Sequence, residues 1–93
     1  MQRFSFIIIS VSNTIFHGDV EKVILPGVEG VMTLLPNHMS IISELTPGTV
    51  SFWSNDNEKN IPISGGFVEM RNNKCTVYLK DDDGLLAPSP GNA

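Results

Sequence analysis

The sequence predicts an all-β fold, a β-sandwich or flattened barrel. Turn-forming residues recur at short intervals along the whole 93-residue chain. No segment spaces its apolar residues as an amphipathic helix would, whereas apolar and polar residues alternate within many short runs. Because alternation buries one face of each strand, two layers must pack against each other to cover those faces.

The short apolar runs between turns predict nine strands. We expect them at residues 4–11, 14–17, 20–25, 31–35, 40–45, 49–53, 60–64, 67–71 and 74–79. The last strand shows the clearest alternation, with Cys75, Val77 and Leu79 on the buried face and Tyr78 on the other. The same rule pairs Ile61 with Ile63, and Val68 with Met70, as inward residues.

Three connections have specific turn chemistry. Pro47-Gly48 predicts a type II turn in which Gly48 takes a positive φ, and Asn72-Asn73 predicts a tight hairpin because Asn tolerates the left-handed region. Residues 54–58 are polar and predict a longer surface loop.

The domain is expected to span residues 1–80, followed by a tail at 81–93. The chain is long enough for one small domain. After Leu79 the alternation stops, and an acidic run at residues 81–83 is followed by a stretch containing Pro88, Pro90 and Gly91. Such a composition predicts a disordered or loosely docked tail.

Charge and composition exclude several classes of protein. The net charge is −4, and the six basic residues are scattered singly, so no basic face for nucleic acid is expected. The apolar run at residues 6–9 is far shorter than the roughly 20 residues of a spanning helix, and we expect a soluble, unexported protein. Cys75 is the only cysteine, so no disulfide can form within the chain.

No catalytic or metal-binding constellation is apparent, and no cofactor is expected. His17 and His38 lack a second ligand at a suitable spacing. Ser64-Gly65-Gly66 is neither a nucleophile elbow nor a phosphate loop, and predicts a sheet corner where two strands approach closely. Cys75 is expected in the core, and Trp53 is expected to be half-buried cover, with a binding anchor as the alternative.

Three ordered blocks resemble the epsilon subunit of rotary F-type ATP synthases. They are LPGVEG at residues 25–30, LPNH through TPGTV at residues 35–50, and ISGGFVEM at residues 63–70. FHG at residues 16–18 with VEKV at residues 20–23 is similar to the opening hairpin of the same family. The resemblance covers about residues 4–80.

The resemblance implies a fold and a role. The family's N-terminal domain is a β-sandwich of about ten strands, and a C-terminal helical pair, which carries the restraint on ATP hydrolysis, follows it. No helical pattern follows Leu79, so that pair is expected to be absent. The implied role is a non-catalytic rotor subunit that links the gamma subunit to the c-subunit ring and couples proton transport to ATP synthesis. The implied location is the cytoplasmic face of the bacterial inner membrane, reached only through the complex.

The resemblance also implies two contact surfaces. Val28, Glu29, Gly30 and Val31 match the turn that contacts the c-ring, although the family often has an acid where this chain has Val31. Ser10, His38 and Ser43 match positions that lie toward gamma. Asn37 stands where the family usually has Gly, and the alternative for all these residues is that they are ordinary surface turn residues.

Two other classes of protein remain as alternatives. A carbohydrate-binding β-sandwich would display several aromatic side chains on one face, and Trp53 and Tyr78 are the only amphipathic aromatics. A small enzyme would need a clustered acid, base and nucleophile, which the chain does not offer.

Overall fold

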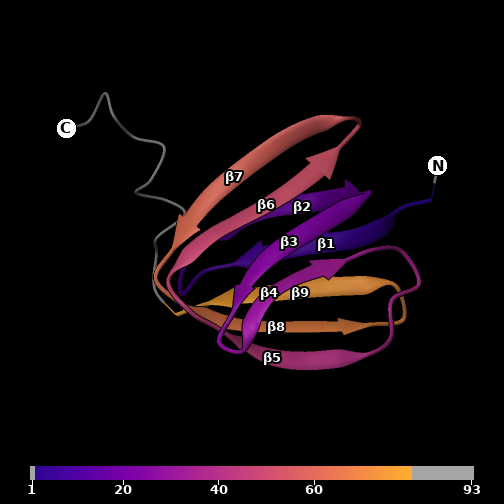
Figure 1. Cartoon of the computed structure of the whole chain (residues 1–93). Coiled ribbons are helices and arrows are strands. Elements are labelled where there is room, and N and C mark those ends of the chain that lie inside the picture. The colour runs from indigo at the N-terminus through magenta and orange to yellow at the C-terminus, as the bar shows by residue number, and fades with distance from the viewer. Residues whose placement is uncertain (1, 81–93) are drawn as a thin grey trace.

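The computed structural model describes residues 2–80, which fold into nine strands (Figure 1). The strands are β1 (Phe4–Ile9), β2 (Thr14–Val20), β3 (Lys22–Gly27), β4 (Gly30–Leu34), β5 (Ile41–Leu45), β6 (Gly48–Ser54), β7 (Asn57–Ile63), β8 (Gly66–Arg71) and β9 (Lys74–Leu79). Each overlaps a predicted strand, whereas the family resemblance suggested about ten. The described residues contain no helix able to cross a bilayer. The predicted tail, residues 81–93, lies outside the described residues.

All nine strands belong to one sheet that curls over on itself, which confirms the all-β prediction. Their order is β2-β1-β9-β8-β5-β3-β6-β7, and β4 pairs with the other side of β3. Strand β5 joins β3 through one residue pair, Gly27 with Leu45, so the sheet turns there from one layer into the other. Figure 1 shows β6 and β7 in one layer and β5, β8 and β9 in the opposite layer. The only parallel pairing among residues 2–80 joins β1 to β9.

Three phenylalanines connect the two layers. Phe52 of β6 lies 5.1 Å from Phe6 of β1 and 4.5 Å from Phe16 of β2, measured between ring centroids. Strand β6 pairs with neither β1 nor β2, so these contacts cross the sandwich. Tilted rings at such distances gain about 0.5–1.5 kcal/mol per pair beyond area burial.

The core follows the predicted alternation. Cys75, Val77 and Leu79 are buried and Tyr78 is exposed, and Val68 and Met70 are fully buried. Ile63 is also buried, and Ile61 packs against the core while remaining partly exposed. Burying one side chain of this size stabilises the fold by about 1.5–3 kcal/mol. Burial of the alternating apolar residues therefore determines which face of each strand is turned inward.

Two hairpins have two-residue turns in the left-handed region. Asn72 and Asn73 have φ values of 52° and 59°, which confirms the predicted tight hairpin. The loop predicted at residues 54–58 is wrong, because β6 and β7 extend through it and leave a turn of only Asn55 and Asp56, with φ values of 54° and 66°. The polar composition of residues 54–58 suggested a long loop. Asn and Asp, however, are also the residues that tolerate the positive φ values of a tight turn.

The predicted geometry of the Pro47-Gly48 turn is also wrong. Gly48 is absent from the residues with positive φ and instead begins β6. Its lack of a side chain serves packing, because a Cβ there would lie 2.8 Å from Cβ of Pro26. Glycine is needed at this position for space and not for φ.

Gly65 and Gly66 form the predicted sheet corner. Their φ values are +136° and +153°, and a Cβ on Gly66 would lie 2.2 Å from the carbonyl oxygen of Tyr78. Gly66 pairs with Leu79 on one side and with Leu45 on the other. The missing side chain therefore lets three strands meet where the sheet changes layer.

We predict that Gly66→Ala strongly destabilises the domain. The new methyl group would combine a disfavoured backbone conformation with contact against fixed backbone atoms, and the cost should be at least about 2 kcal/mol. Urea unfolding followed by Trp53 fluorescence measures it. The control is Gly30→Ala, which has a positive φ but open space around the new Cβ. Equal stability of the two variants would contradict the steric argument.

Candidate functional site

The predicted contact residues lie at different places on the sandwich. One end, which we call the loop end, holds Gln2, the loop of residues 35–40 and the β8–β9 turn, on the right in Figure 1. The other, the turn end, holds the β1–β2 and β3–β4 turns and the glycine corner. Ser10 and the Val28–Val31 segment lie at the turn end, His38 lies at the loop end, and Ser43 lies midway along β5. The structure does not bring Ser10 and His38 together.

The β3–β4 turn projects apolar side chains around one carboxylate. Val28 and Val31 are 50% and 76% exposed, and Glu29 is exposed between them. The backbone N–H of Val28 donates to the carbonyl of Glu44 at 3.0 Å, and Gly30 takes the positive φ of +130°. The turn is therefore tied to the neighbouring β5 and can present these groups in a fixed arrangement.

A pocket of about 210 Å³ lies beside this turn. Val28, Glu44, Phe67 and Lys80 contribute to its lining. The sequence did not predict this pocket, because its walls come from four separate segments. The sign that could have indicated the pocket is Phe67, an aromatic residue that alternation places on the outward face because its neighbour Val68 faces inward.

Ser10 is an internal turn residue. It is 5% exposed, and its backbone N–H donates to the carbonyl of Asn13 at 2.7 Å. Its hydroxyl donates to the same carbonyl and accepts from the Asn13 N–H, both at 3.1 Å. The side chain thus shapes the β1–β2 turn, and any effect on a partner would come through that shape.

His38 is exposed in a loop rich in apolar side chains. Leu35 and Met39 are 48% and 81% exposed. The His38 N–H donates to the carbonyl of Leu35 at 3.1 Å, and Asn37 has a φ of 65°. The left-handed position predicted for Asn37 is confirmed.

Ser43 faces the inner side of the sheet, and its neighbours carry the exposed surface. Ser43 pairs with buried Val68 and is half-buried itself. Ile42 and Glu44 project to the opposite, outer face. There Ile42, Phe67 and Tyr78 are 76%, 53% and 45% exposed, and we call these three residues the outer-face strip.

The outer-face strip crosses several strands. Phe67 pairs with Tyr78, and Tyr78 pairs with Ile9, so an apolar row continues to the residue before Ser10. Ile42 lies diagonally from Phe67 because it pairs with Glu69. Apolar side chains grouped in this way on a small domain indicate an interaction surface.

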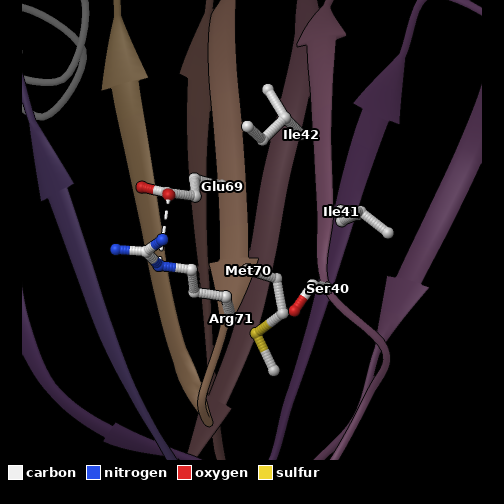
Figure 2. Close-up of a pocket in the computed structure, with 6 residues that line it drawn as sticks. All are labelled: Ser40, Ile41, Ile42, Glu69, Met70 and Arg71. Atoms are coloured by element: carbon white, nitrogen blue, oxygen red, sulfur yellow. Dashed lines mark ion pairs between the residues drawn. The ribbon is translucent and has the colours of Figure 1, made fainter.

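An open groove of about 340 Å³ borders this strip (Figure 2). Figure 2 shows Glu69 and Arg71 on the same side of β8, with Arg71 Nε 3.6 Å from Glu69 Oε2. The remaining lining is provided by Ser40, Ile41, Ile42 and Met70. The groove has apolar walls and one exposed ion pair, which suits a protein surface better than a small polar substrate.

The two histidines lie on different elements, and Cys75 is buried. Residues 2–80 contain no group of three His, Cys, Asp or Glu side chains that could hold a metal ion. His17 lies on β2 opposite Ile7, whereas His38 lies in the loop at residues 35–40. Burial raises the pKa of the Cys75 thiol from 9.0 to about 12, so the thiol stays protonated and unreactive at neutral pH.

Trp53 lies on β6 between Lys22 of β3 and Glu58 of β7. It is half-buried, and Lys22 Nζ lies 4.4 Å from the ring centroid. The Glu21 N–H donates to the Trp53 carbonyl at 2.9 Å. These contacts support the predicted covering role, because the ring already has an intramolecular cation over its face.

A known family matches almost all of the described chain. Residues 3–81 match the family described as ATP synthase, Delta/Epsilon chain, beta-sandwich domain. The chain is 34% identical to the ATP synthase epsilon chain of Leptospira borgpetersenii serovar Hardjo-bovis (strain JB197), across 85% of this chain and 61% of that protein. It is 37% identical to the ATP synthase epsilon chain of Bordetella avium (strain 197N), across 75% of this chain and 50% of that protein. The chain thus spans roughly half of the length of such relatives.

Solved structures share the fold. One match is the mitochondrial ATP synthase of Euglena gracilis, in a structure of OSCP, F1 and the c-ring, with a TM-score of 0.78 and 19% identity over 83% of this chain and 50% of that one. Another is the central stalk and c-ring of the Tetrahymena thermophila mitochondrial ATP synthase, with a TM-score of 0.71 and 12% identity over 86% of this chain and 65% of that one. At such low identity these matches support the fold alone.

We predict that the Cys75 thiol makes stability depend on pH in the alkaline range. In the unfolded chain the Cys75 thiol ionises near pH 9, whereas in the folded protein burial keeps it protonated until about pH 12. The contribution of the buried, protonated thiol to the free energy of unfolding is therefore fully present below pH 9. Between pH 9 and pH 12 the free energy of unfolding should fall by about 1.4 kcal/mol per pH unit. Urea unfolding of the native chain and of Cys75→Ala should show the difference between them shrinking as pH rises. A constant difference would mean that the thiol titrates normally.

Proposed function

The chain belongs to the family of the ATP synthase delta/epsilon chain beta-sandwich domain, and on this premise we propose that it is a central-stalk subunit of a rotary ATP synthase. The role is non-catalytic: the subunit links gamma to the c-ring and passes rotation between them. The match over residues 3–81 carries the proposal. It is supported by relatives that are themselves named ATP synthase epsilon chains.

The curled sheet suits the transmission of torque. Its strands are joined edge to edge through both layers, and the aromatic contact of Phe52 with Phe6 and Phe16 fastens the layers together. A rotor subunit must transmit force without deforming, and a closely packed interior resists compression. The domain therefore acts as a stiff spacer.

The gamma surface is proposed along the outer-face strip and its borders. His38 lies beyond the start of β5, Ser43 lies within β5, and Ser10 follows Ile9 at the far end of the apolar row. These three residues do not meet at one point: the His38 side chain is exposed, whereas Ser10 is buried and Ser43 faces inward, so these two would act through the strands that carry the outer-face strip. A stable contact buries about 800 Å² per partner, and a face of four strands can supply such an area.

The c-ring surface is proposed at the turn end. Val28, Glu29, Gly30 and Val31 form its tip, with apolar contact from the two valines and one charge from Glu29. Because His38 lies at the loop end, the two proposed partners engage different parts of the domain. The complex then lies at the cytoplasmic face of the bacterial inner membrane, which the chain reaches through the c-ring.

We expect His38→Glu and Ile42→Glu each to weaken binding to gamma by more than tenfold, or about 1.4 kcal/mol. Each change would place a charge against a desolvated partner surface, while both positions are exposed in the free domain. The matched control is Lys59→Glu on exposed β7 in the other layer. Titration calorimetry measures affinity, and thermal unfolding checks the fold. Unchanged affinity in both variants, with native melting temperatures, would place gamma elsewhere.

For the c-ring, Val31→Cys should form a disulfide or short-linker cross-link with a cysteine introduced in the loops of the ring. Val31 is 76% exposed, whereas Cys75 is buried and should give no background. The control is Asn57→Cys at the start of β7, on the loop-end side of the domain, because Asn55 of the same turn bonds to Glu21, the ion-pair partner of Arg3. Mass spectrometry of the assembled complex identifies the products. Cross-linking from Asn57 and not from Val31 would mean that the loop end, and not the turn end, faces the c-ring.

A further inference from the structure

Three distant segments meet at the loop end through side-chain amides. The N–H of Asn37 donates to Oδ1 of Asn73 at 2.6 Å, and Nδ2 of Asn37 donates to Oε1 of Gln2 at 3.0 Å. The carbonyl of Asn73 accepts the N–H of Ser5 at 3.0 Å. The N-terminal strand, the loop at residues 35–40 and the β8–β9 turn are thus joined by a cluster of Gln2, Asn37 and Asn73, which we call the amide clamp.

Two members of the amide clamp need unusual backbone conformations. Asn37 has a φ of 65° and Asn73 a φ of 59°, and glycine would adopt either with less steric cost. Glycine could not make the side-chain bonds, because it has neither the Oδ1 acceptor nor the Nδ2 donor. Asparagine can provide both the left-handed conformation and the bonds, and at position 73, where only an oxygen acceptor is used, aspartate could provide them as well.

The amide clamp holds a loop that is otherwise weakly attached. Leu35 is 48% exposed and Met39 is 81% exposed, so few apolar contacts fix residues 35–40. Strand β4 ends at Leu34 and β5 pairs with β8 only from Ile41 onward, so residues 35–40 themselves belong to no strand pair. The amide clamp therefore contributes contacts that secondary structure does not supply at this place.

We propose that Asn37 and Asn73 are positioning residues that hold the loop carrying His38 and Met39 in its binding conformation before gamma arrives. This inference rests on the proposed function, since it takes gamma as the partner of the loop. A loop that is already ordered loses less conformational freedom on binding, and the complex should form faster and last longer. The expected partner surface is apolar, with room for the Met39 side chain, since Leu35 and Met39 are the large apolar side chains that the loop exposes.

The test replaces Asn73 by glycine. Asn73→Gly keeps the left-handed φ available and removes the side chain with its Oδ1 acceptor, and Asn72→Gly is the matched control that removes the same side chain at the neighbouring position with a φ of 52°. Hydrogen exchange by NMR reports the loop directly. The His38 N–H is the decisive probe, because its own acceptor is the Leu35 carbonyl and the substitution does not touch it. We expect at least tenfold faster exchange at His38 in Asn73→Gly and no change in Asn72→Gly.

Binding to gamma, measured by surface plasmon resonance, completes the test. We expect a threefold to tenfold loss of affinity for Asn73→Gly, native affinity for Asn72→Gly, and recovery in Asn73→Asp, which restores an oxygen acceptor. Exchange that changes only at Asn37, or faster loop exchange with native affinity, would overturn the inference while leaving the proposed function intact. A native chain that fails to bind gamma would overturn both.

Discussion

The contact of Phe52 with Phe6 and Phe16 is the interaction on which the architecture depends. A single sheet has two faces, and a chain of 93 residues has no helix or second domain within residues 2–80 to cover the apolar one. The sheet must therefore curl until its own ends meet, and these rings fill the space where they do. At the opposite side of the curl, Gly66 allows the close approach that the bend requires. The small size of the domain thus requires both the contact between these phenylalanines and the glycine corner.

Local patterns predicted the strands and much of the core, because alternation and turn chemistry act over a few residues. Cys75, Val77 and Asn72-Asn73 are examples in which local preference and the final fold agree. Gly48 is the contrary case, since its glycine is required by Pro26, a residue distant in sequence, and a turn rule has no access to that contact. The parallel pairing of β1 with β9 was equally invisible, because nothing in either run of residues specifies its partner.

The candidate surfaces, like the fold, could be predicted from the sequence only in part. Family resemblance selected Ser10, His38, Ser43 and the Glu29 turn, but sequence order could not show that Ser10 is buried in its own turn or that His38 lies at the opposite end. The outer-face strip emerges only after the register of β5, β8 and β9 is known, because its members come from three strands. Exposure of an apolar residue is a property of the assembled sheet, and single strands do not reveal it.

The pairing of β1 with β9 affects how the chain is made. The first strand, Phe4–Ile9, can form a hairpin with β2 early, but its other edge waits for Lys74–Leu79. At about 5–20 residues per second, a ribosome needs several seconds to reach that segment. Throughout this interval the apolar edge is a template for pairing with other nascent chains. Synthesis close to a chaperone, or to an assembling partner subunit, would shorten the period in which the newborn protein is vulnerable to aggregation.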